Sequence, residues 1–161
     1  MDFAELYERY ARDVHRFALF LSGNAAVAED LTAETFVRAL VARNDLRVDT
    51  VRAYLLAIAR NLHRDLRRRE GRLVSLETAW ESVDPAIRPD AAAEGRLRLQ
   101  RALDAVQLLP QGEREALVLA VDSELSYERI AVILGCSVPA VKVRIHRARA
   151  RLRSILDKER T

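Results

Sequence analysis

Apolar residues recur along almost the whole chain at spacings of three and four, the period of an amphipathic helix. In the first half this pattern predicts three helices. The first covers Asp2–Leu21 and stops at Ser22-Gly23, and Asn24 caps a second that runs to about residue 43. A polar connection over 44–50 follows, and Asp49 or Thr50 is expected to cap a third helix that starts at Val51.

The second half of the chain predicts four more helices. One runs from Ala91 to about Leu108, another starts at Leu109-Pro110, and two lie within Ser126–Leu156. Residues 71–90 keep no sustained period and contain glycine and proline, which indicates a linker. The predicted fold class is therefore all-α, with two small helical domains (1–70 and 91–161) joined by a linker over 71–90.

The last two helices have the signature of a helix-turn-helix. Ser126 can cap the first, Gly135-Cys136 ends it, and Ser137 can cap the second, with Pro139 in its first turn, where a missing N–H does no harm. The expected buried seam of the second helix is Val138, Val141, Ile145, Ala148, Leu152 and Ile155. In a helix-turn-helix the second helix enters the DNA major groove.

Charge is distributed unevenly, although the net charge is only +3. Residues 142–153 carry six Lys or Arg and no acid, and residues 60–72 carry six Arg against two acids, whereas 77–128 is acidic. Solvated helix faces usually mix their charges, so two basic islands favour two separate nucleic-acid contacts. Taken alone, each basic island could also be explained as a helix face that is merely solvated and binds no nucleic acid.

Composition excludes several other classes. A single cysteine, Cys136, rules out an internal disulfide framework, and three scattered histidines offer no metal-ligand spacing. No nucleophile–base set and no phosphate-binding glycine loop is visible, so we expect no enzyme, no cofactor and no metal. No run approaches membrane-spanning length and no signal peptide is recognised, which predicts a soluble, cytoplasmic protein.

Short motifs occur in a fixed order along the chain. In the first half they are Leu6-Tyr7-Glu8-Arg9-Tyr10, Ala28-Glu29-Asp30-Leu31-Thr32, Glu34-Thr35-Phe36, Ile58-Ala59-Arg60-Asn61 and Arg67-Arg68-Arg69. In the second half they are Leu109-Pro110, Arg114, Leu125-Ser126-Tyr127-Glu128, Leu134-Gly135-Cys136-Ser137, Val141-Lys142 and Arg147-Ala148-Arg149. In order and spacing these motifs resemble bacterial sigma factors of the extracytoplasmic-function (ECF) type, over nearly the whole chain.

The resemblance implies a promoter-specificity subunit whose first domain docks on the clamp helices of the largest subunit of core RNA polymerase. The implied docking residues are Asp30, Leu31, Ala33, Glu34, Val37 and Arg38. Spacing alone favours a simple i,i+4 charge ladder for Asp30, Glu34 and Arg38. The resemblance also implies control by an anti-sigma factor, often membrane-bound, with no membrane insertion of this chain itself.

The same resemblance implies two DNA contacts. The −10 element would be recognised and melted by Arg47, Asp49, Thr50, Arg60, Asn61, Arg64, Arg67 and Arg68. The −35 element would be read by Ser137, Pro139, Ala140, Lys142, Val143, Arg144, His146 and Arg147. Pro139-Ala140 replaces a frequent Gly-Thr of the family and Val143 a frequent Ser, so no −35 sequence is transferred to this protein.

Two other readings stay open from the sequence. An independent transcription regulator could use the same helix-turn-helix, with the first half as a dimerisation or sensor domain. Such a regulator would not need the basic island of the first half or the Asp30–Arg38 surface, and it would bind duplex DNA without polymerase. An enzyme is the third reading, and no residue set supports it.

Overall fold

The computed structural model describes residues 2–42, 51–72, 91–122 and 125–160, and in these ranges it contains seven α-helices and no strand. The predicted all-α fold class is confirmed. The helices are α1 Phe3–Ser22, α2 Ala25–Val41, α3 Val51–Arg72, α4 Ala91–Gln107, α5 Gln111–Val121, α6 Tyr127–Leu134 and α7 Val138–Arg160.

The break between α1 and α2 depends on a glycine. Gly23 has φ of 68° and its N–H donates to the carbonyl of Leu19, which ends α1 in the left-handed conformation that glycine adopts most easily. A Cβ at this position would also lie 2.7 Å from Cγ of Gln107 in α4, so any larger residue here would force the Gln107 side chain to move. Asn24 then caps α2 by accepting the N–H of Val27, as predicted.

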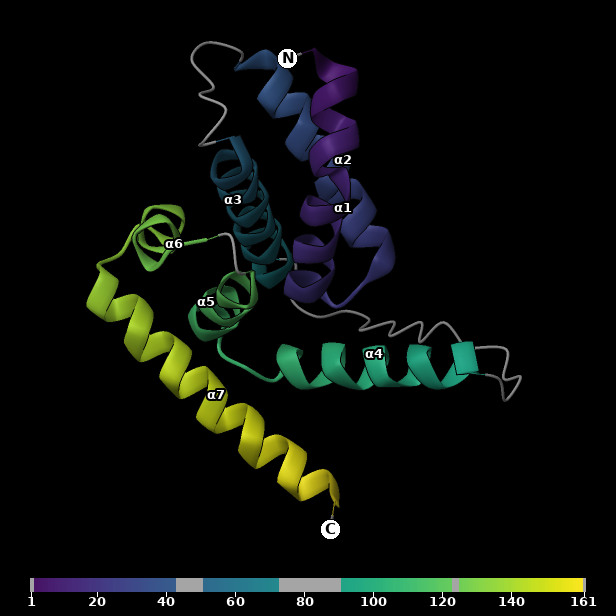
Figure 1. Ribbon diagram of the computed structural model, residues 1–161, viewed down its shortest axis with the longest axis vertical. Coiled ribbons are helices and arrows are strands. Elements are labelled where there is room, and N and C mark those ends of the chain that lie inside the picture. Colours follow the sequence, from purple (N-terminus) through teal and green to yellow (C-terminus); the bar gives the residue numbers. More distant parts are fainter. Residues whose placement is uncertain (1, 43–50, 73–90, 123–124, 161) are drawn as a thin grey trace.

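The two halves of the chain pack against each other. In Figure 1 α1, α2 and α3 form one group, α6 packs on α3, α5 packs on α1 and α6, and α7 runs along the outside from the end of α6. One hydrophobic cluster continues from the first half into the second, and it includes Phe17, Leu21, Leu55, Leu119, Ile130 and Val141. The sequence pattern does not determine the relative position of the two halves.

Several element boundaries differ slightly from the predicted ones. Helix α3 continues to Arg72, so the first two residues of the predicted linker are helical, and α7 continues past Leu156 to Arg160. Residues 73–90, the rest of the predicted linker, lie outside the described residues, as do the expected caps Asp49 and Thr50. Within the described ranges, no helix is long and apolar enough to cross a bilayer.

Candidate nucleic-acid interface

Helices α6 and α7 form the helix-turn-helix that the sequence predicts. Oγ of Ser126 accepts the N–H of Arg129 at 3.2 Å, and Oγ of Ser137 accepts the N–H of Ala140 at 3.2 Å, so both serines cap their helices. Gly135 takes φ of 63° between them and ends α6. The short turn therefore fixes where α7 begins and which of its faces turns outward.

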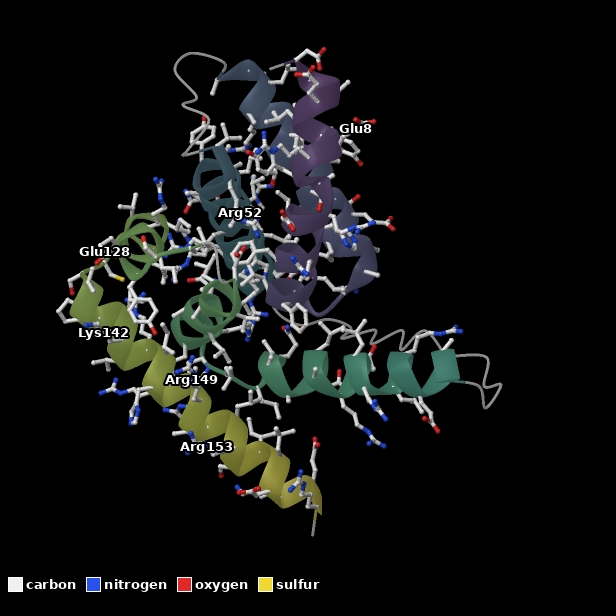
Figure 2. The ribbon with its side chains drawn as sticks, viewed as in Figure 1. Glu8, Arg52, Glu128, Lys142, Arg149 and Arg153 are labelled. Atoms are coloured by element: carbon white, nitrogen blue, oxygen red, sulfur yellow. The ribbon has the colours of Figure 1, made fainter. Side chains whose placement is uncertain are left out.

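One face of α7 is buried and the opposite face is exposed. Val141, Ile145 and Ala148 of the predicted seam are buried, and Leu152 and Ile155 pack farther along against Leu109 and Leu117. Six predicted −35 residues are exposed, and Ala140 is half-buried; the exposed ones are Ser137, Pro139, Lys142, Val143, His146 and Arg147. Figure 2 shows Lys142, Arg149 and Arg153 spread along α7 as a row of cationic side chains.

Arg144 departs from this pattern. Its side chain is half-buried and its guanidinium carbon lies 3.8 Å from the position that a Cβ on Gly112 of α5 would occupy. Its Nη1 is buried, and among the described residues it has no hydrogen-bond partner. In this arrangement Arg144 faces α5, and Lys142 and Arg147 remain the exposed cations near the start of the helix.

The basic island of the first half is divided between exposed and covered residues. Asn61, Arg67 and Arg68 are exposed on α3, whereas Arg60 and Arg64 turn toward the second half of the chain. The three remaining predicted −10 residues, Arg47, Asp49 and Thr50, lie outside the described residues.

The partner of Arg60 and Arg64 is Glu115 of α5. Nη2 and Nε of Arg64 donate to the Glu115 carboxylate at 2.7 and 3.0 Å, and Nε of Arg60 donates to it at 3.4 Å. The hydrogen bonds that Arg64 donates to Glu115 raise the pKa of the Arg64 guanidinium, and burial partly opposes that effect. Sequence reasoning missed Glu115, because an acid within an acidic stretch carries no local signal of a partner 51 residues earlier.

A second buried residue of α5, Arg114, joins the two halves. Its guanidinium donates to the carbonyl of Leu21 in α1 at 2.9 Å and to three carbonyls at the junction of α4 and α5. Burial lowers the pKa of Arg114, and the nearby Arg67 lowers it further. His63 of α3 lies close to this cluster and is 1% exposed.

The predicted polymerase-facing surface on α2 is largely open. Asp30, Ala33, Glu34, Val37 and Arg38 are exposed, and Arg38 pairs with Glu34 at 3.3 Å. Leu31 differs from the other five because it is buried in a small cluster with Ala18, Ala28 and Leu62. It supports the exposed surface from beneath.

The fold and the two basic helices define a helix-turn-helix protein with a second helical unit packed on it. Residues 6–73 match the family model of Sigma-70 region 2, and residues 99–152 match that of Sigma-70, region 4. The chain is 38% identical over 141 residues to the ECF RNA polymerase sigma factor EcfG of Rhodopseudomonas palustris, covering 87% of this chain and 77% of that protein. The chain belongs to the family of ECF RNA polymerase sigma factors.

Other relatives agree with this assignment. The ECF RNA polymerase sigma factor SigE of Mycolicibacterium smegmatis is 40% identical over 161 residues; the match covers 96% of this chain but spans only 61% of that relative's length. The solved structure of the sigma factor RpoE with the anti-sigma factor NepR from Bartonella quintana has a TM-score of 0.79 and 31% identity, covering 97% of both chains. The structure of CnrH with the cytosolic domain of CnrY has a TM-score of 0.72 and 31% identity, covering 97% of this chain and 88% of that one.

Proposed function

We propose that this protein binds core RNA polymerase and directs promoter-specific initiation by recognising −10 and −35 elements. The observation that supports it most is the presence of both family regions in one chain, region 2 over α1–α3 and region 4 over the second half. It acts in the cytoplasm, where transcription takes place, and contributes binding and base recognition without a catalytic step of its own.

The −35 element is assigned to the exposed face of α7. A helix that enters the major groove reads bases with side chains near its start, while cations farther along contact phosphates. Lys142 and Arg147 are exposed near the start, and Arg149 and Arg153 lie farther along. We therefore assign base recognition to the first pair and positioning on the backbone to the second.

We expect Lys142→Ala with Arg147→Ala to weaken −35-dependent promoter binding by the holoenzyme about 30-fold or more, since each base contact contributes about 1–3 kcal/mol. Competition between promoters with and without the −35 element measures the loss. The affinity for core polymerase should stay unchanged, and Arg149→Ala with Arg153→Ala is the matched control, expected to weaken all DNA equally. Equal loss on both promoters for the first pair would contradict the assignment.

The −10 element is assigned to α3 and to the connection that precedes it. Five of the predicted residues lie along α3. Three of them are exposed, namely Asn61, Arg67 and Arg68, and the other two, Arg60 and Arg64, are paired with Glu115. Guanidinium groups bind phosphates and stack on unpaired bases, which are the two interactions that hold a melted strand. This assignment supports a role in promoter melting for the first half of the chain.

Core polymerase is assigned to the exposed surface of α2. We expect Asp30→Arg with Glu34→Arg to weaken the affinity for core polymerase about tenfold or more, because two charges of a complementary surface are reversed. The exposed Glu34–Arg38 pair contributes little to folding, so helicity and thermal stability should change little. Glu94→Arg with Asp104→Arg, two exposed acids on α4, is the matched control, and an equal loss from both variants would remove the docking assignment.

Control by an anti-sigma factor is the remaining part of the proposal. Two similar structures, of RpoE and of CnrH, contain an anti-sigma factor or its cytosolic domain. The TM-score of 0.79 over 97% of both chains means that the halves of this protein are arranged much as they are in RpoE with NepR. We infer that a comparable partner holds this protein inactive.

Open-complex formation with purified core polymerase on a library of genomic promoters tests the proposed function. Protein-dependent melting near −10 would support it and identify both promoter elements. Duplex binding by the protein alone, without any effect on melting, would instead favour an independent regulator.

A further inference from the structure

Glu115 occupies the position of an anion between the two arginines that the proposed function assigns to −10 DNA. Its side chain is 0% exposed, and those of Arg60 and Arg64 are 12% and 32% exposed. Arg64 approaches it with Nε and Nη2 together, the two-pronged geometry in which guanidinium also binds a phosphate. While this contact persists, a DNA phosphate cannot take the same place.

We propose that Glu115 is a built-in competitor of the −10 strand, which holds Arg60 and Arg64 in a closed form of the free protein. This inference rests on the proposed function, because it takes these two arginines as DNA contacts. In the closed form, promoter DNA must first displace Glu115. A sigma factor away from polymerase is thereby kept from binding single-stranded DNA with its melting surface.

Other contacts between the halves belong to the same closed form. Nη2 of Arg60 also donates to the carbonyl of Leu134 at the end of α6, at 3.3 Å, which links the −10 arginine to the helix-turn-helix. Nε2 of Gln107 in α4 donates to the carbonyl of Phe20 in α1 at 2.7 Å. Arg52 of α3, labelled in Figure 2, pairs with Asp122 just after α5.

Because these contacts all join the two halves, they must break together when the halves separate. The carboxylate of Glu115 pairs with two residues that are assigned to DNA, so removing its charge acts both on closure and on the competition with phosphate. Polymerase would shift the equilibrium by binding the open form better than the closed one. The closed form therefore couples access to the −10 residues with the separation of the two halves.

Glu115→Gln tests the inference in the full-length protein, because it keeps the size of the side chain and removes its charge. We expect a larger radius of gyration in small-angle X-ray scattering. We also expect fluorescence anisotropy to show about tenfold or more tighter binding of a labelled random-sequence single-stranded 20-mer DNA, since charge-assisted bonds to both arginines are weakened. Circular dichroism verifies that the helices remain folded.

Glu113→Gln is the matched control. Glu113 lies two residues away on the same helix and pairs with Arg151 of α7 at 2.8 Å, within the second half. The Glu113→Gln variant should have the same radius of gyration and the same DNA affinity as the wild type. If Glu115→Gln is folded and behaves like this control, Glu115 does not hold the closed form and the inference is wrong.

A triple variant separates failure of this inference from failure of the proposed −10 role. Adding Arg60→Gln and Arg64→Gln to Glu115→Gln should keep the larger radius of gyration but abolish the gain in DNA affinity. If the triple variant binds DNA as tightly as Glu115→Gln, then these arginines are not the DNA contacts. In that case the −10 assignment fails, and so does the proposal that Glu115 competes with DNA for these arginines. The change in the radius of gyration reports only on whether Glu115 holds the two halves together.

Discussion

Arg114→Met is expected to lower the free energy of unfolding by about 4 kcal/mol, measured by chemical denaturation at neutral pH. Arg114 is 3% exposed, and its guanidinium donates to the carbonyls of Val106, Leu21, Gln107 and Leu109 at 2.9–3.1 Å. A buried carbonyl that loses its partner costs about 1–3 kcal/mol. Methionine keeps the apolar stem of the side chain but satisfies none of the four carbonyls.

Two effects reduce the loss below the sum of four unpaired groups. Removing the guanidinium also removes the cost of burying its charge, the same cost that lowers the pKa of Arg114. Water that enters the site can pair with part of the carbonyls. Four unpaired carbonyls would together cost between about 4 and about 12 kcal/mol. We therefore expect a loss of unfolding free energy near the lower end of this range.

Arg101→Met, on the exposed side of α4, is the matched control and should change the unfolding free energy by less than about 0.5 kcal/mol. Arg114→Lys should lose nearly as much as Arg114→Met, because an ammonium group cannot reach four carbonyls arranged around a planar fork. A loss below about 1 kcal/mol for Arg114→Met would mean that these carbonyls find other partners, and that Arg114 does not join the halves.

The parts of the fold that could be predicted depend on local signals. Asn24, Ser126 and Ser137 cap their helices, and Gly23 and Gly135 end theirs, as the sequence pattern indicates. Each signal acts within a few residues of the chain, so spacing is enough to read it. The apolar seam of α7 is equally local, because helix geometry alone places its residues on one face.

The position of Arg144 in the helix indicates its burial better than its charge does. It stands three residues after Val141 and four before Ala148, both of which are buried, so helix geometry places it on the edge of the seam. Charge alone groups it with Lys142 and Arg147. The structure turns it toward Gly112 instead, and this is why the −35 variant pairs Lys142 with Arg147.

The pairing of the two halves could not have been predicted from spacing. Glu113, Arg114 and Glu115 follow one another along α5, and three successive charges are typical of a solvated helix start. All three are buried, because their partners come from other helices and, for Arg114 and Glu115, from the other half of the chain. A long-range ion pair leaves no period or motif in either segment, so only the three-dimensional structure reveals it.

His63 should make the free energy of unfolding decrease at acidic pH. Burial lowers its pKa from 6.5 to about 4, and the cations of Arg67, Arg114 and Arg64 add to this effect, while Glu115 opposes it. The folded protein therefore holds a neutral imidazole, whose Nδ1 has no hydrogen-bond partner among the described residues. Unfolding returns the side chain to water, where it binds a proton at a higher pH.

The direction of the pH dependence follows from the pKa of His63 in the unfolded chain, 6.5, and its pKa in the folded protein, about 4. Above pH 6.5 the imidazole is neutral in both states and the full stability is present. As the pH falls from 6.5 toward 4, the unfolded chain takes up a proton that the folded protein does not, so the free energy of unfolding decreases. The gap between the two pKa values corresponds to a loss of roughly 3 kcal/mol, complete below about pH 4.

Chemical denaturation of the wild type and of His63→Gln between pH 7.5 and pH 4 measures this contribution. Carboxylates also take up protons over part of this range, so the wild type contains their effect as well, and the difference between the two profiles isolates His63. We expect His63→Gln to lose roughly 3 kcal/mol less than the wild type over the acid range, whatever its stability at pH 7.5. His146→Gln, on the exposed face of α7, is the control and should follow the wild-type profile. Parallel profiles for the wild type and His63→Gln would mean that the imidazole is charged in the folded protein, and that the cluster around Arg114 and Glu115 tolerates another cation.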